Sequence, residues 1–244
     1  MNKPKYTVTN RAMQLKGQII KRAKNAALYV HATQQMYHDA RIRNAYSTIA
    51  MKNNKLTQEQ VSDIIDDKYV DLTAKEILEV KNAYAAYSLL YHRNFESINP
   101  FSITEMLSSH HAFMAGLSKE AGRFRTEPSA KNIPRHMEDL MEWAKTYDEH
   151  LFIKSCVVHY DIILMKPFAD GNEFIARKWQ ILLLLQRNDV SLRIPLLNVV
   201  YERRQKYYDI LAIANKAEGC TKFIEFMLQA MSDALAEYEK DPLG

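Results

Sequence analysis

The stretch that decides the fold runs from Lys166 to Arg177 and reads Lys-Pro-Phe-Ala-Asp-Gly-Asn-Glu-Phe-Ile-Ala-Arg. Proline cannot continue a helix and Asp-Gly-Asn is typical of a turn, so one helix should end before Pro167 and another should begin near Asn172. A helix N-terminus presents unpaired N–H groups and the positive end of the helix dipole, which suits phosphate. The pattern therefore predicts a phosphate-binding turn, and Asp170 beside it could hold a divalent metal.

The composition of the whole chain favours helices. Its 244 residues include 6 glycines, a share of about 2.5% against a usual share of about 7%. Tight turns between strands need positive φ angles, so a sheet protein requires more glycine than this. The apolar share of 47% and the charged share of 25% exclude a disordered chain. We therefore predict an all-α fold.

Capping boxes predict where several helices begin, because a Ser or Thr oxygen accepts an early N–H group and a Glu or Gln three residues later reaches back. The pairs are Thr57 with Gln60, Thr73 with Glu76, and Ser102 with Glu105. A helix should follow Pro134, which fits the first helical position. Later helices are expected at about 150–166, 172–188, 197–216 and 220–239.

The N-terminal part of the chain is strongly basic. Residues 1–38 hold seven basic side chains and no acidic one. Such a block can bind nucleic acid, but the apolar residues Leu15, Ile19, Ala23, Ala27 and Val30 follow one helical face, so the segment can also pack while its lysines face water. We favour packing, and expect a basic helical segment at 1–45 attached to a main domain at 46–240.

The location of the protein is predicted from what the sequence lacks. Its longest aliphatic run, Ile181 to Leu185, is far below the roughly 20 residues that cross a bilayer, and the first residues form no apolar signal core. Cys156 and Cys220 are far apart and form no metal-binding pattern. We expect a cytoplasmic protein with no membrane span.

The motif and several other segments resemble the Fic family. Its signature is H-x-F-x-[DE]-G-N-G-R-x-x-R, which residues 166–177 follow in part. His159-Tyr160 stands seven residues before the motif as in that family, residues 122–126 resemble its G-x-[FY]-R-T segment, and residues 48–57 resemble its inhibitory-helix segment. The resemblance covers nearly the whole chain and implies a Fic/Fido-type helical domain.

The resemblance also implies roles for individual residues. In the family, the motif histidine is the base for a target hydroxyl that attacks the α-phosphate of ATP, so that AMP is transferred to the target. By position, Asp170 matches the magnesium ligand, Gly171 and Asn172 the phosphate turn, and Arg177 the second phosphate-binding arginine. ATP and Mg²⁺ are then the cofactors to consider if nucleotide binding survives.

Three motif positions depart from the family. Lys166 stands in place of the histidine, and lysine, with a reference pKa of about 10.4, is almost wholly charged at neutral pH. Glu173 replaces the second glycine, which brings a carboxylate to the phosphate turn. Phe174 replaces the first arginine and removes a phosphate donor. Loss of a general base alone typically costs about 10²- to 10⁴-fold in rate.

Two further parts are altered outside the motif. Lys52 occupies the place of the inhibitory glutamate, where a positive charge near Arg177 would repel instead of pairing. The family's β-hairpin flap, which aligns the target, falls between Arg125 and Pro134, and the eight residues there include Pro128 and are too few for two pairing strands. We expect this flap to be reduced or absent.

These five changes favour a pseudoenzyme that has lost AMP transfer, needs no cofactor and acts by binding a protein partner. One alternative is an active nucleotidyl- or phosphotransferase with altered chemistry, in which Lys166 and Arg177 grip phosphate. Another is a nucleotide- or anion-binding sensor built on Lys52, Lys166 and Arg177. His110 and His159 lie on apolar helical faces and are expected to be core histidines with satisfied hydrogen bonds.

Overall fold

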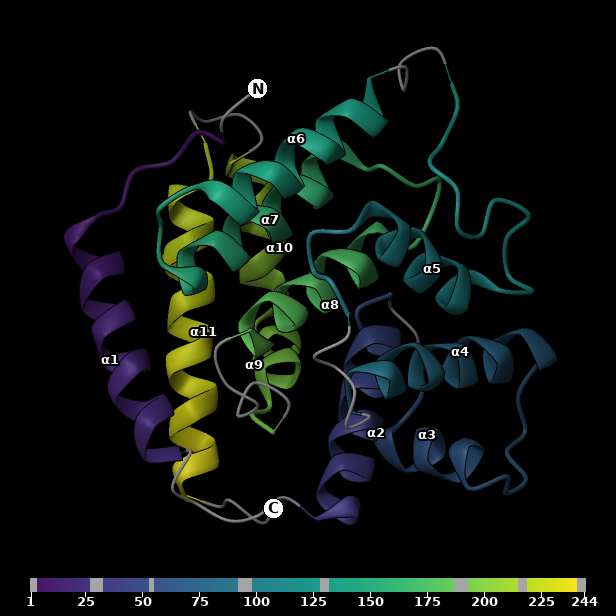
Figure 1. The fold of residues 1–244 in the computed structure, drawn as a ribbon. Helices are drawn as coiled ribbons and strands as arrows, with labels where there is room; N and C mark the ends of the chain where they lie inside the picture. The colour runs from purple at the N-terminus through teal and green to yellow at the C-terminus, as the bar shows by residue number, and fades with distance from the viewer. Residues whose placement is uncertain are drawn as a thin grey trace.

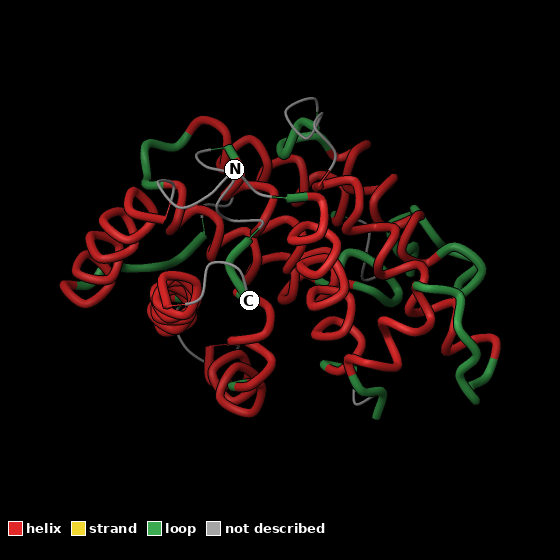
Figure 2. Tube along the Cα trace, turned by 90° about the horizontal axis from the view of Figure 1, so that it is seen from below, coloured by secondary structure: helices red, strands yellow, loops and turns green. Residues whose placement is uncertain are grey.

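The computed structural model of the chain describes residues 4–26, 33–52, 55–91, 98–127, 132–186, 193–214 and 219–240. These residues form helices joined by loops and contain no strand (Figure 2), which confirms the all-α prediction. The helices are α1 (Asn10–Ala26), α2 (Gln34–Ala50), α3 (Gln58–Ile65), α4 (Ala74–Tyr91), α5 (Ile103–Met114), α6 (Ile133–Thr146), α7 (Leu151–Met165), α8 (Asn172–Leu185), α9 (Leu196–Glu202), α10 (Arg204–Ala214) and α11 (Thr221–Lys240).

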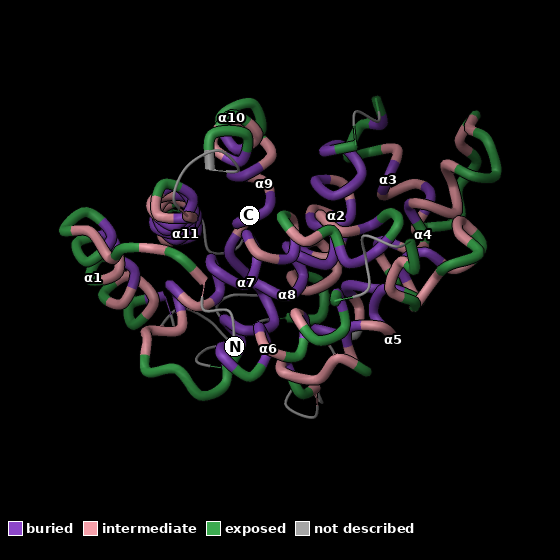
Figure 3. Tube along the Cα trace, turned by 90° about the horizontal axis from the view of Figure 1, so that it is seen from above, coloured by how far each residue is buried: buried purple, intermediate pink, exposed green. Residues whose placement is uncertain are grey.

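The helices α7 and α8 form the buried centre of the molecule (Figure 3). Every residue of α8 from Phe174 to Leu185 is buried, because neighbouring helices pack on all of its faces. Residues 166–171, here called the motif loop, join these two central helices, so the core sets the position of this loop. No helix in the described part of the chain has the length and apolar character needed to cross a membrane.

The basic N-terminal helix packs on the last helix of the chain. Figure 1 shows α1 lying along α11. Leu15 and Ile19 of α1 are buried, and Arg22 forms an ion pair with Glu239. Ala27 and Val30 lie outside the described residues. The boundary expected between residues 45 and 46 falls inside α2, which is one continuous helix.

The helix starts follow the capping signals. At Thr57 both bonds of the predicted capping box are present, and at Thr73 the hydroxyl and the backbone N–H both bond to Glu76. The prediction of one helix over 197–216 was wrong, because the chain there forms α9 and α10. The break lies at Arg203, whose N–H bonds to carbonyls of α9 while its guanidinium pairs with Asp233 at 2.6 Å.

Candidate functional site

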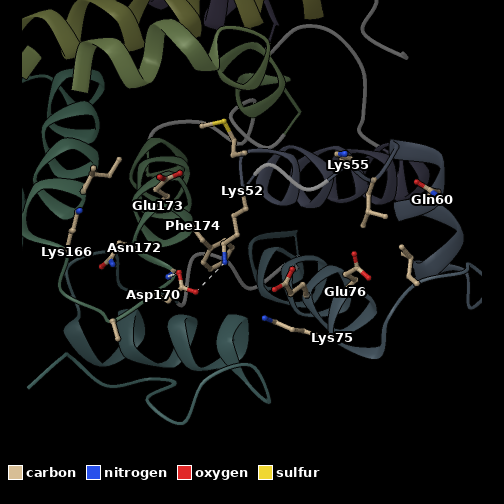
Figure 4. A pocket seen from close by; sticks show the side chains of 17 residues that line it. Lys52, Lys55, Gln60, Lys75, Glu76, Lys166, Asp170, Asn172, Glu173 and Phe174 are labelled. Atoms are coloured by element: carbon tan, nitrogen blue, oxygen red, sulfur yellow. Dashed lines mark hydrogen bonds and ion pairs between the residues drawn. The ribbon is translucent and has the colours of Figure 1, made fainter. Parts of the chain in front are cut away.

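Arg125 holds the start of the motif loop. After α7 the chain turns at Lys166, which has a left-handed φ of 45°. The Nε of Arg125 donates to the carbonyl of Lys166 at 2.6 Å, and its backbone N–H donates to the carbonyl of Pro167 at 3.0 Å. These bonds fix the point where the Lys166 side chain leaves the helix. That side chain is exposed and reaches the edge of a groove (Figure 4).

The interior of the loop is closed by Asn172. Its amide nitrogen donates to the carbonyl of Phe168 at 2.8 Å, and its amide oxygen accepts the N–H of Phe168 at 2.9 Å. Gly171 has a φ of 76°, in the left-handed region that side chains disfavour. The Asn172 side chain is therefore used to shape the loop, and Gly171 allows the turn from which α8 begins.

His110 of α5 supports the loop from below. Its Nδ1 accepts the N–H of Gly122 at 2.9 Å, and its Nε2 bonds to the carbonyl of Asp170 at 3.0 Å. Because an N–H can only donate and a carbonyl can only accept, the ring is neutral with its proton on Nε2. Burial lowers the pKa of His110 and favours this form. The ring also stacks on Phe168 at a centroid distance of 3.8 Å.

Glu173 and Arg177 form an ion pair within the motif itself. Arg177 is 2% exposed, and its Nη1 lies 3.1 Å from Oε2 of Glu173. The hydroxyl of Tyr208 in α10 donates to the same oxygen at 2.9 Å. Burial, followed by the negative charge of Glu173, raises the pKa of Tyr208, so this hydroxyl keeps its proton. The Glu173 carboxylate is thus held between two donors at the first turn of α8.

Phe174 joins the core. It is 1% exposed, stacks on Phe113 at a centroid distance of 3.8 Å and meets the edge of Tyr87 at 5.3 Å. The position that carries a phosphate donor in the family signature therefore contributes packing in this chain.

Lys52 pairs across the groove with the motif loop. Its Nζ lies 3.7 Å from Oδ2 of Asp170 and 5.3 Å from the ring centroid of Phe113. Figure 4 shows this ion pair as a dashed line between the two segments. The other oxygen of Asp170 accepts the N–H of Gly171 at 2.6 Å. Lys52 therefore makes a favourable contact with Asp170, a pairing that the sequence analysis did not predict.

A groove of about 1130 Å³ lies between the motif loop and the segments around α3 and α4. Apolar side chains of Leu56, Leu72, Ile163 and Phe174 line part of it. Its charged lining consists of Lys52, Lys55, Lys75, Glu76, Glu79, Lys166, Asp170 and Glu173 (Figure 4). The structure thus brings the altered motif positions and Lys52 to one opening. Arg177 lies behind this lining, beside Glu173.

Two contributions to the site were missed from the sequence. His110 was expected to be a core histidine, and it is one, but it also holds the loop carbonyl of Asp170. Tyr208 gave no signal, because a tyrosine in an amphipathic helix does not show which distant residue it meets. His159 matches its prediction, since it is fully buried and bonded to Gln180 at 2.6 Å and to Tyr207 at 2.9 Å.

The segment where a flap was considered carries no strand in its described part. Thr126 and Glu127 lie in a loop, and α6 begins at Ile133 with a proline in its first turn. Residues 128–131 lie outside the described residues. The helix predicted after Pro134 is confirmed.

Comparisons with known proteins agree with this arrangement. A profile of the Fic/DOC family matches residues 100–184, which include the whole motif. Protein adenylyltransferase fic-1 of Caenorhabditis elegans is 23% identical over 226 residues, with 85% of this chain and 43% of that protein covered. The chain thus spans less than half the length of this curated relative.

Solved structures are similar over the whole chain. The fold matches Fic-1 of C. elegans with a TM-score of 0.79 at 22% identity, covering 93% of this chain and 72% of that one. The crystal structure of a Fic family protein from Desulfovibrio desulfuricans G20 matches with a TM-score of 0.91 at 32% identity, covering 100% of this chain and 78% of that one. With the helical fold, the motif loop and these matches together, the chain belongs to the Fic family.

Proposed function

We propose that this protein is a Fic-family pseudoenzyme that does not transfer AMP and acts by binding a protein partner. The observation that carries the proposal is the Glu173 carboxylate in the first turn of α8, bonded to Arg177 and Tyr208. A negative side chain there occupies the surroundings that an anionic phosphate would need. The motif arginine already has a counter-charge, so a phosphate would have to displace Glu173.

The proposal is also supported by the poor fit of these residues to a magnesium nucleotide. Asp170 is the motif position for the metal, but the ammonium group of Lys52 lies 3.7 Å from its free oxygen and would repel a divalent cation. The carboxylate of Glu173 pairs with Arg177, so this arginine has no free charge to offer a phosphate group. We therefore assign no chemical step to ATP or Mg²⁺.

Lys166 stands where the family signature has the histidine that acts as a base. Its side chain is exposed at the edge of the groove. The groove beside it combines apolar side chains with both signs of charge, which a protein partner with complementary charges could match. A protein partner at this groove is the function that the site supports best.

The proposal is tested by incubating the protein with ATP, Mg²⁺ and cell lysate and measuring the mass of the proteins present. We expect no added AMP that depends on this protein. The matched variant carries Lys166→His, Glu173→Gly and Phe174→Arg, which restores the three family residues. A mass increase of one AMP on any protein, produced by the unaltered chain, would overturn the pseudoenzyme proposal.

A further inference from the structure

A second, smaller hollow lies away from the motif groove, between α1, α10 and α11. Its volume is about 330 Å³. Eight side chains line it, and they are Arg11, Arg203, Lys206, Ile210, Lys222, Glu225, Phe226 and Gln229. Half of them are basic and come from three segments that are far apart in the sequence. Folding therefore gathers four positive charges around one small space.

Two acidic groups at or beside this hollow are already bonded within the protein. The one acid of the lining, Glu225, accepts the hydroxyl of Thr9 at 2.5 Å. Asp233, outside the lining, pairs with Arg203 at 2.6 Å. The lining therefore holds four cations and one carboxylate.

Two of the four cations are available to a ligand. Lys206 and Lys222 are exposed, and neither side chain makes an ion pair or hydrogen bond with another described residue. Arg11 donates from one nitrogen to Gln229 at 3.2 Å, which leaves the rest of its planar fork of donors for another group. Flexible ammonium groups beside an arginine fork are suited to an anion with several oxygens.

The helix positions of these cations are unfavourable for folding alone. Arg11, Lys206 and Lys222 each stand in the first turn of their helix, and none of these first turns contains an acidic residue. The N-terminal end of a helix dipole is positive, so a cation there is destabilising. Three helices thus carry a cation at their N-terminal end beside the same hollow. A bound anion would compensate all three.

We propose that this hollow, the basic cleft, binds a phosphate monoester. A dianionic phosphate would meet Lys206, Lys222 and Arg11, while Phe226 and Ile210 provide an apolar wall for the organic part of the ligand. Phe226 is buried and Ile210 is half-buried, so this wall is a fixed part of the helix packing. The volume suits a single phosphorylated side chain or a small phosphorylated metabolite.

Calorimetry on the full chain with phenyl phosphate tests the proposal. We expect a dissociation constant of about 0.1 to 1 mM, with no binding of phenol. Lys206→Gln with Lys222→Gln should weaken binding by about tenfold or more. The matched control is Lys21→Gln with Lys24→Gln, which removes the same charge from the exposed face of α1 and should bind as the unaltered chain does.

The outcomes distinguish specific binding at the basic cleft from non-specific electrostatic attraction to a positively charged surface. Unchanged melting temperature, or an increase, in the Lys206/Lys222 variant shows that its fold is intact. A peptide carrying phosphotyrosine serves as a second probe: tighter binding than phenyl phosphate identifies a phosphorylated protein as the source, and equal binding identifies a small ester. Equal weakening in both lysine variants, or no binding of either probe by the unaltered chain, would overturn the proposal.

Discussion

Glu173 is the residue that distinguishes this motif most clearly from the family signature. Its side chain is 38% exposed at the surface of the groove, yet its carboxylate contacts a guanidinium that is 2% exposed. A buried charge without a partner is unfavourable by several kcal/mol. The glutamate therefore stabilises the fold at the position where the family signature has glycine.

Replacement of Glu173 by glutamine tests whether the fold depends on the ion pair between Glu173 and Arg177. The change keeps the shape of the side chain but leaves Arg177 without a counter-charge. We expect a loss of about 1 to 3 kcal/mol in the free energy of unfolding, less than for a fully buried pair because Glu173 is partly exposed. Urea denaturation measures it. Glu138→Gln, at an exposed position of α6, is the control and should change stability by no more than about 0.5 kcal/mol; equal losses would show that Arg177 does not need the carboxylate.

The buried His159 should make the stability of the protein depend on pH. Burial, together with the positive charge of Arg177, lowers the pKa of His159 from 6.5 to about 3, although its hydrogen bond to Gln180 acts in the opposite direction. The unfolded chain binds a proton below about pH 6.5 while the folded chain does not, so the stabilisation is present above pH 6.5 and is lost as the pH falls toward 3.

The measurement is the melting temperature between pH 7.5 and 4. The unaltered chain should melt at progressively lower temperature as the pH falls, and His159→Gln should show a shallower dependence. His136→Gln, at a partly exposed position of α6, should keep the full slope. A slope that His159→Gln leaves unchanged would assign the acid sensitivity to other groups.

At the scale of elements, the motif loop depends on the turn at Gly171. A Cβ there would lie 3.2 Å from Nε2 of His110 and 3.3 Å from the sulfur of Met114, at a φ of 76°. Gly171→Ala should therefore lower stability by about 1 to 2 kcal/mol. Gly17→Ala, inside α1 with no atom within 4 Å of the added carbon, should instead raise it by about 0.5 to 1 kcal/mol. Thermal unfolding of both variants compares them, and a neutral Gly171→Ala would mean that the loop does not require its left-handed turn.

The start of a helix could be predicted from the sequence where neighbouring residues determine it. Capping residues at Thr57 and Thr73 act on groups three residues away, so the sequence alone indicates these starts. The break at Arg203 is different, because its side chain pairs with Asp233 in another helix. No glycine or proline marks that break, and it depends on how α10 packs.

The same distinction holds for the candidate site. The loop, its left-handed glycine and the burial of Phe174 follow from neighbouring residues and from the motif. The contacts of Lys52 with Asp170 and of Tyr208 with Glu173 join segments that are distant in the sequence. The resemblance to the family's inhibitory segment placed Lys52 near Arg177, whereas the packing of α2 beside the loop gives it an acidic partner.

For the whole molecule, the altered positions act together. Segments around α2, α5 and α10 all hold the loop and the first turn of α8, with polar contacts from Lys52, His110 and Tyr208. The charged groups that a nucleotide would use are thereby bonded within the protein. We infer that this internal pairing replaces nucleotide binding.

Titration calorimetry with Mg²⁺–ATP tests that claim most directly. The unaltered chain should give no binding heat up to about 1 mM nucleotide. The variant with Lys166→His, Glu173→Gly and Phe174→Arg should bind, because it frees Arg177 and restores the first arginine of the family signature. Binding of Mg²⁺–ATP by the unaltered chain with a dissociation constant in the micromolar range would contradict the account.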